Sequence, residues 1–121
     1  MLNLDTHILI DALHQRLRPA ERQLLEGDAW SVSGIVLWEL AALARAGRIH
    51  FGPDDPALRR LVRDMTVWPI TLDIAGTLRR LDFRGDPADE IIAATSVVHD
   101  LPLVTRDMRI LSSKVVPLAL R

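Results

Sequence analysis

Short apolar segments alternate with helical patterns along the whole chain, and this alternation limits the possible folds more than any other feature of the sequence. Strand-like stretches cover residues 1–4, 29–32, 67–71, 103–105 and 115–118. Helical spacing of apolar residues begins after Asp5 and Thr6 and recurs in residues 19–27, 34–46, 53–65, 72–81, 86–99 and 107–111. Because strands that alternate with helices tend to pair in parallel, we expect an α/β fold. Its central, mainly parallel, twisted sheet should have about four to five strands and be flanked by helices.

The length and composition indicate one domain that spans residues 1–121. A chain of 121 residues with 49% hydrophobic and 26% charged residues can bury a single core, and no linker or repeat divides it. The absence of cysteine excludes disulfides, thiolate zinc sites and thiol nucleophiles. No apolar run approaches the roughly 18 residues of a membrane span, so we expect a cytoplasmic protein without membrane contact.

Two aspartates directly follow predicted strands. Asp5 comes after the first strand, and Asp107 comes shortly after the fourth. Open parallel sheets bind ligands beyond the carboxyl ends of their strands, so both carboxylates are expected at the same edge of the sheet. Each also stands immediately before a helical segment, where an N-cap role alone is a sufficient explanation.

Two further acids lie within predicted helices. Glu39 interrupts the most apolar helix, since the residues three and four positions away from it are all apolar. A carboxylate in such a stripe needs a partner, and neither Arg45 nor Arg48 has the required spacing, so we expect the partner elsewhere in the fold. Asp89 lies in the first turn of a helix capped by Asp86, on the row that faces inward. A favourable interaction with the helix dipole is the alternative explanation for Asp89.

The predicted fold places these four acids, Asp5, Glu39, Asp89 and Asp107, near one edge of one sheet. Clustered carboxylates repel one another, so they either bind protons with raised pKa values or are held ionised by a cation. A site made only of carboxylate oxygens suits Mg²⁺ or Mn²⁺. The sequence therefore predicts a divalent metal centre.

The same residues resemble the four acidic motifs of the PIN-domain ribonucleases, in order and over nearly the whole chain. Within that family, the resemblance is to the VapC-like toxins of type II toxin–antitoxin systems. The matching stretches are Leu4-Asp5-Thr6-His7, Ser31-Val32-Ser33 with Leu37-Trp38-Glu39, Asp86-Pro87-Ala88-Asp89 with Ile92-Ala93-Ala94-Thr95, and Thr105-Arg106-Asp107. One position departs from the pattern. Where many relatives have arginine after the third acid, this chain has Glu90.

The resemblance implies a PIN-like fold and a cytoplasmic, Mg²⁺- or Mn²⁺-dependent endoribonuclease. Such proteins are usually homodimers and are neutralised by a VapB-like antitoxin. The resemblance maps the catalytic, metal-binding acids onto Asp5, Glu39, Asp89 and Asp107. It also implies that the hydroxyl groups of Thr6, Ser33 and Thr105 lie around the metal.

Binding of an RNA backbone requires local positive charge, because the formal net charge of the chain is only −1. Arginine provides nearly all the basic residues, and its planar guanidinium suits phosphate recognition. Six arginines in the middle of the chain are candidates for RNA contacts, although solvated helix faces explain them equally well. They are Arg59, Arg60, Arg63, Arg79, Arg80 and Arg84.

Two alternatives from other functional classes remain open. The chain is either a nuclease or a catalytically silent PIN-like module that only binds a partner. The four retained acids argue against the silent module, because unneutralised buried carboxylates destabilise a protein. A receiver-like domain that accepts a phosphoryl group on aspartate ranks lower. It needs a lysine near the acids, and the only lysine is Lys114, late in the chain.

Overall fold

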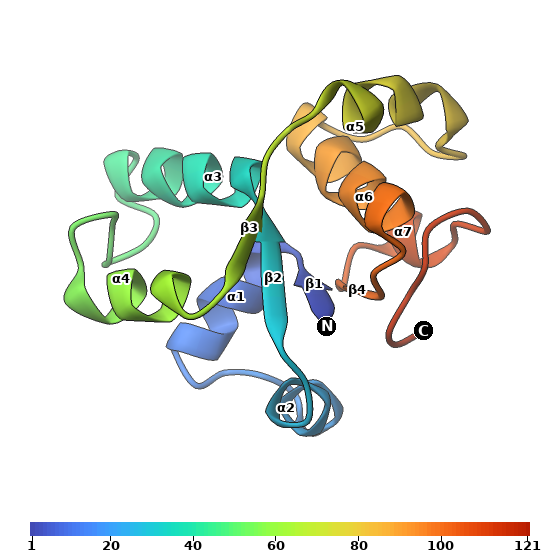
Figure 1. Cartoon of the computed structure of the whole chain (residues 1–121). Coiled ribbons are helices and arrows are strands. Elements are labelled where there is room, and N and C mark those ends of the chain that lie inside the picture. Colours follow the sequence, from blue (N-terminus) through green and yellow to red (C-terminus); the bar gives the residue numbers. More distant parts are fainter.

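The computed structural model describes all residues, 1–121, and confirms the α/β fold (Figure 1). Four parallel strands form one sheet in the order β3-β2-β1-β4. The strands are β1 (Leu2–Leu4), β2 (Trp30–Ser33), β3 (Thr66–Trp68) and β4 (Leu103–Val104). The helices are α1 (Thr6–Leu13), α2 (Pro19–Glu26), α3 (Gly34–Arg45), α4 (Pro56–Arg63), α5 (Leu72–Thr77), α6 (Pro87–His99), α7 (Met108–Leu111) and the 3-10 helix η1 (Leu78–Arg80).

Strand β1 lies inside the sheet and sets the position of the residues that follow the strands. It is fully buried and pairs with β2 on one side and with β4 on the other, where Leu4 lies opposite Val104. Because the strands run parallel, β1, β2 and β4 end at the same edge of the sheet. Asp5, Gly34 and Thr105, which come directly after these strands, therefore lie close together.

Helices cover both faces of the sheet. Figure 1 shows α1, α3 and α4 on one side and α5, α6 and α7 on the other. This cover explains why the strands are apolar on both faces, as parallel sheets generally are. The core contains Leu4, Val32, Leu40, Ile92 and Leu103, which are almost completely buried. None of the helices has the length and apolar character that crossing a membrane requires.

The predicted fifth strand, residues 115–118, is wrong. The segment forms one isolated parallel bridge, between Leu118 and Leu103, and no regular strand. Pro117 has no N–H group and cannot donate a hydrogen bond to a ladder, so its carbonyl alone pairs with Leu103 at 2.9 Å. The sheet therefore has four strands.

Two helix boundaries also differ from the prediction. The helix expected from residue 53 begins at Pro56, because the side chain of Asp55 accepts a hydrogen bond from the N–H of Ala57 and so caps it. The helix expected over residues 72–81 divides into α5 and η1, since its last turn tightens to the 3-10 form.

Candidate active site

A polar hollow of about 510 Å³ lies at the edge of the sheet where β1 and β4 end. No hydrophobic residue lines it, in contrast to the apolar layers on both sides of the sheet. The structure brings all four predicted acids, from four separate parts of the chain, into this one hollow. Its lining residues are Asp5, Thr6, His7, Asp11, Glu39, Asp86, Asp89, Arg106, Asp107 and Arg109.

Asp5 occupies the buried floor of the site, directly after β1. Its side chain caps α1 by accepting a hydrogen bond from the N–H of Thr6 at 2.8 Å. The hydroxyl of Thr105 donates to its other oxygen at 2.6 Å. Burial raises the pKa of Asp5, and these two hydrogen bonds oppose that rise. Asp5 therefore caps α1 and also lines the hollow, so the two explanations do not exclude each other.

Glu39 reaches the hollow from α3 and finds its partner outside its own helix. The hydroxyl of Thr6 donates a short hydrogen bond to its carboxylate. Neither Arg45 nor Arg48 forms an ion pair with it, as the spacing predicted. Burial raises the pKa of Glu39, the Thr6 hydroxyl opposes the rise, and the nearby charge of Asp5 adds to it.

Asp89 projects from the first turn of α6, where Asp86 caps the helix by accepting from the N–H of Asp89 at 3.1 Å. Burial, followed by the charges of Asp86, Asp5, Asp107 and Glu39, raises the pKa of Asp89 to about 7. Among the neighbouring charges, that of Asp86 contributes most to the raised pKa of Asp89. The hollow thus contains a fifth influential carboxylate, which the sequence analysis had treated only as a cap.

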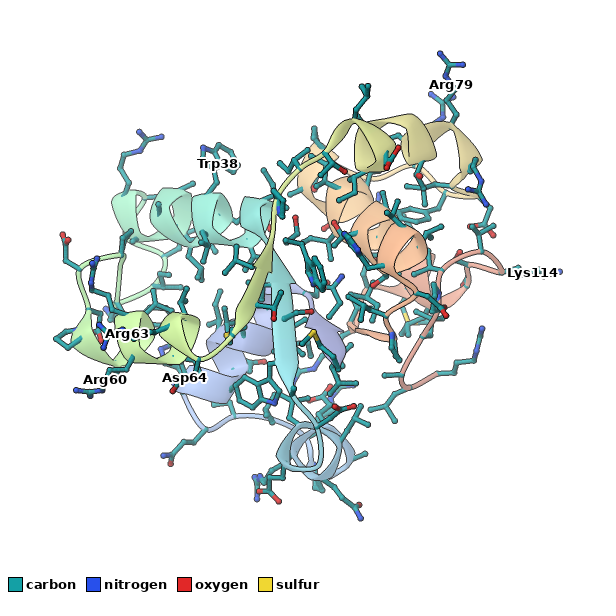
Figure 2. The ribbon with its side chains drawn as sticks, viewed as in Figure 1. Trp38, Arg60, Arg63, Asp64, Arg79 and Lys114 are labelled. Atoms are coloured by element: carbon teal, nitrogen blue, oxygen red, sulfur yellow. The ribbon has the colours of Figure 1, made fainter.

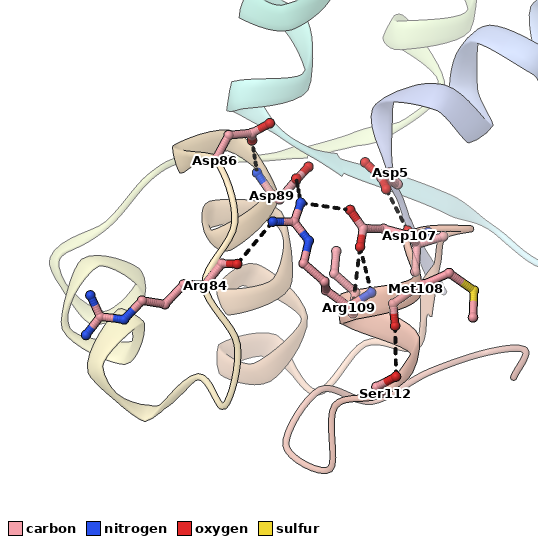
Figure 3. A network of polar contacts seen from close by, with 10 residues as sticks. Asp5, Arg84, Asp86, Asp89, Asp107, Met108, Arg109 and Ser112 are labelled. Carbon is pink, nitrogen blue, oxygen red and sulfur yellow. Dashed lines mark hydrogen bonds and ion pairs between the residues drawn. The ribbon is translucent and has the colours of Figure 1, made fainter.

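Asp107 stands at the start of α7, opposite Asp89. Its side chain caps this short helix by accepting from the backbone N–H of Arg109 at 2.9 Å. The guanidinium of Arg109 folds back over the same carboxylate and lies between Asp107 and Asp89 (Figure 3). Two acids, distant in sequence, thus share one positively charged side chain.

Comparison with known proteins identifies the family. The model of the PIN domain matches residues 3–114. The chain belongs to the PIN-domain family. A curated relative, Ribonuclease VapC22 from Mycobacterium tuberculosis, is 38% identical over 117 residues, which cover 92% of this chain and 90% of the relative. This match confirms the resemblance to VapC-type PIN domains.

Solved structures share the fold of this PIN domain. A toxin–antitoxin complex from Klebsiella pneumoniae aligns with a TM-score of 0.69 at 25% identity, covering 93% of this chain and 91% of the other. VapBC2 from Rickettsia felis, bound to a DNA fragment from its promoter, aligns with a TM-score of 0.74 at 17% identity, covering 98% and 97% of the two chains. FitAcB from Neisseria gonorrhoeae aligns with a TM-score of 0.67 at 20% identity, covering 91% and 90%.

The predicted hydroxyl groups of the PIN domain take two different positions. Thr6 lines the hollow and donates to Glu39, whereas Thr105 is buried behind Asp5 and donates to it. Ser33 is buried at the start of α3, where its oxygen accepts from the N–H of Ile35 at 3.3 Å, and it does not line the hollow. Its visible role is to cap the helix that carries Glu39.

None of the six predicted RNA-binding arginines lines the hollow. Arg60 and Arg63 lie on α4, while Arg79 lies at the opposite end of the molecule in η1, and all three point outward (Figure 2). The six arginines do not form one patch, because those of α4 lie on the opposite side of the sheet from those of η1, and Arg84 lies in the loop before α6 (Figure 1). The arginines that do line the hollow are Arg106 and Arg109, which the sequence analysis missed.

Arg106 is fixed by a buried partner behind the site. Its Nε and Nη2 donate to the two carboxylate oxygens of Glu21 at 2.8 and 2.6 Å, and its Nη1 donates to Asp11 at 2.5 Å. The pKa of Glu21 is lowered, above all by the hydrogen bonds from Arg106. This ion pair anchors the segment between Thr105 and Asp107 to α2.

The donor set of the hollow fits a hard divalent cation, because carboxylate and hydroxyl oxygens are the ligands that Mg²⁺ and Mn²⁺ prefer. Burial and mutual repulsion raise the pKa of Asp5, Glu39 and Asp89, and a bound cation relieves both effects. In the present side-chain arrangement, no three His, Cys, Asp or Glu side chains are close enough to hold one ion together. A cation held by three of these acids would therefore require their side chains to move closer together.

Proposed function

We propose that this PIN domain is a metal-dependent endoribonuclease toxin that hydrolyses RNA phosphodiester bonds. The observation that carries the proposal is the convergence of Asp5, Glu39, Asp89 and Asp107 in one hollow without apolar lining. The relative named Ribonuclease VapC22 supports RNA as the substrate. Since RNA is the substrate of the proposed reaction, we also propose that the protein acts in the cytoplasm.

Asp5, Glu39, Asp89 and Asp107 would hold Mg²⁺ or Mn²⁺ in the hollow that they line. When bound, a divalent cation lowers the pKa of water, offsets the charge of the phosphate and stabilises the leaving oxygen. The protein contributes orientation. The hydroxyl of Thr105 orients the carboxylate of Asp5, and the hydroxyl of Thr6 orients that of Glu39.

The structure favours a nuclease over the two alternatives. In a silent module, the raised pKa values of Asp5, Glu39 and Asp89 reflect a destabilising cluster that has no use and that the exposed Arg109 offsets only in part. A receiver-like phospho-acceptor needs a lysine at the acids, and the single lysine, Lys114, lies outside the hollow beside Asp82.

The proposed partner is a VapB-like antitoxin, and an apolar groove offers it a surface. The groove, of about 360 Å³, lies between α3 and α4. Arg59 and Arg63 border it, so a segment with apolar residues and flanking acids would match its chemistry. The groove residues are Leu37, Leu40, Pro53, Leu58, Arg59, Val62 and Arg63. Toxin–antitoxin complexes among the structural neighbours support this partner, and we further propose a homodimer.

RNA cleavage by matched variants tests the proposed activity. Wild-type protein should cleave single-stranded RNA in the presence of Mg²⁺ or Mn²⁺ and stop when EDTA is added. Asp5→Asn should remove cleavage, whereas Asp64→Asn, an exposed aspartate at the end of α4, should leave it unchanged. A folded Asp5→Asn variant that cleaves RNA as fast as the wild type contradicts the proposal.

A further inference from the structure

The side chain of Arg109 occupies the space between two acids of the hollow (Figure 3). Its Nη2 lies 3.4 Å from Asp89 Oδ2 and 3.4 Å from Asp107 Oδ2. Its Nη1 donates to the backbone carbonyl of Arg84 at 3.1 Å. A single positive group therefore bridges the two carboxylates that enter the site from α6 and α7.

The contacts of Arg109 with the two acids are long. A separation of 3.4 Å exceeds the 2.7–2.9 Å of strong charge-assisted hydrogen bonds. The side chain of Arg109 is 55% exposed, so water competes for its charge. Arg109 thus lies between Asp89 and Asp107 without being fixed to either of them.

Arg106, the other arginine of the hollow, is held firmly, in contrast to Arg109. Its guanidinium is held by short bonds to Glu21 and Asp11 and faces the back of the site. Its positive charge is already paired with those two carboxylates. Arg109 is therefore the positive side chain available to Asp89 and Asp107.

The loop before α6 also contacts Arg109. A Cβ atom at Gly85 would lie 3.4 Å from the Asp89 carboxylate and 3.5 Å from Arg109 Nη2, which are ordinary van der Waals distances. The hydrogen bond from Arg109 to the carbonyl of Arg84, in the same loop, is therefore the backbone contact that supports the bridging position.

We propose that Arg109 is an internal counter-cation that a divalent metal displaces from between Asp89 and Asp107, and that the released guanidinium then binds a phosphate of the RNA. The inference rests on the proposed function. It follows from competition, since a guanidinium and a metal ion cannot occupy the same position between two carboxylates. Once released, an exposed arginine at the rim of the hollow has phosphate as its natural partner.

Removal of the Arg109 guanidinium should strengthen the binding of Mn²⁺ and weaken the binding of RNA. Two exposed ion pairs are lost, so Mn²⁺ should bind about 3- to 10-fold more tightly to Arg109→Gln than to the wild type. The KM for single-stranded RNA at saturating Mn²⁺ should rise by a similar factor of about 3 to 10, because one phosphate contact is lost. If Arg109 has only a structural role, Arg109→Gln should weaken the binding of both Mn²⁺ and RNA or change neither.

Isothermal titration with MnCl₂, together with RNA cleavage kinetics, tests the proposal. The variants are Arg109→Gln, Arg109→Lys, which keeps the charge, and the control Arg84→Ala. Arg84→Ala also removes one positive charge, but the side chain of Arg84 points away from the acids, and its carbonyl remains (Figure 3). Arg109→Lys and Arg84→Ala should both bind Mn²⁺ with nearly wild-type affinity. Circular dichroism checks that each variant is folded.

The outcomes separate this inference from the proposed function. Tighter Mn²⁺ binding and a higher KM in Arg109→Gln support the inference. Unchanged or weaker Mn²⁺ binding in Arg109→Gln overturns it, provided that Asp89→Asn reduces wild-type Mn²⁺ binding as the proposed function requires. An unchanged KM overturns the phosphate contact. If the wild type binds no Mn²⁺ and cleaves no RNA, both proposals are wrong.

Discussion

Arg106 and Glu21, which are 85 positions apart in the sequence, form a two-bond ion pair behind the acidic hollow. The pair ties the segment that follows β4 to α2. Thr105 and Asp107, on either side of Arg106, both take part in the acidic site. The geometry of the site thus depends on an interaction that lies outside its reacting groups.

Glu21→Gln should destabilise the fold by about 1.5–3 kcal/mol, because a buried, charge-assisted pair is broken. Urea unfolding at pH 7 measures the loss. The pKa of Glu21 is lowered below its ordinary value of 4.5, so its contribution is present above pH 4.5. It should disappear as the pH falls through the lowered pKa. The stabilities of wild type and Glu21→Gln should therefore converge in acid, and a constant difference down to pH 2 would contradict this assignment.

Thr105→Val should weaken metal binding and RNA cleavage by about 10- to 100-fold, because its hydroxyl orients Asp5. The same oxygen accepts from the N–H of Asp107 at 3.1 Å, so the substitution loosens two acids at once. Thr66→Val, the same change on β3, is the control and should have little effect on either quantity. Measurement of the Mn²⁺ dissociation constant and of kcat/KM distinguishes the two variants. Equal values for both would show that Thr105 has no positioning role.

In EDTA, the stability of the protein should fall as the pH rises from about 4 to about 7. The pKa of Asp89 rises from its ordinary value of 3.8 to about 7 in the fold, so the folded state binds more protons than the unfolded state in that window. Stability then decreases with pH. Added Mn²⁺ should reverse the trend, since metal binding requires ionised carboxylates. Thermal unfolding at pH 5, 6, 7 and 8, with and without Mn²⁺, gives the comparison.

Asp89→Asn should raise the melting temperature of the metal-free protein at pH 8 and abolish its RNA cleavage. The substitution removes a charge that burial and four neighbouring carboxylates disfavour. It also flattens the pH dependence predicted above. Differential scanning calorimetry in EDTA measures the gain, with the exposed Asp73→Asn as the control. A lower melting temperature for Asp89→Asn would mean that its ion pair with Arg109 outweighs the repulsion.

The sequence was sufficient to predict the acidic hollow because local patterns constrained each acid separately. Asp5 and Asp107 stand between a strand and a helix, and parallel pairing then brings them to one edge. Glu39 is polar in an apolar helix and so required a distant partner, which is Thr6. These inferences need only the periodicity of the helices and the direction of the strands.

Other features depend on tertiary packing and could not be predicted in this way. Asp86 looked like a simple cap, and its position in the hollow depends on how α6 enters the fold. Arg109 follows Asp107 by two residues in a helix of only four residues, so no periodic pattern indicated its direction. Trp38 lies in an apolar helical stretch, which favours packing in the core, yet it is 61% exposed, because α3 turns that side toward solvent (Figure 2).

The caps of α1 and α6 affect the order in which the protein folds and binds its proposed ion. Asp5 and Asp86 direct the N-terminal ends of two helices toward the hollow, and these ends carry partial positive charge. Together with Arg109, they offset part of the repulsion before any metal arrives. The chain should therefore be able to fold before it binds the proposed ion. The proposed cleavage of RNA would then begin in a step that is separate from folding.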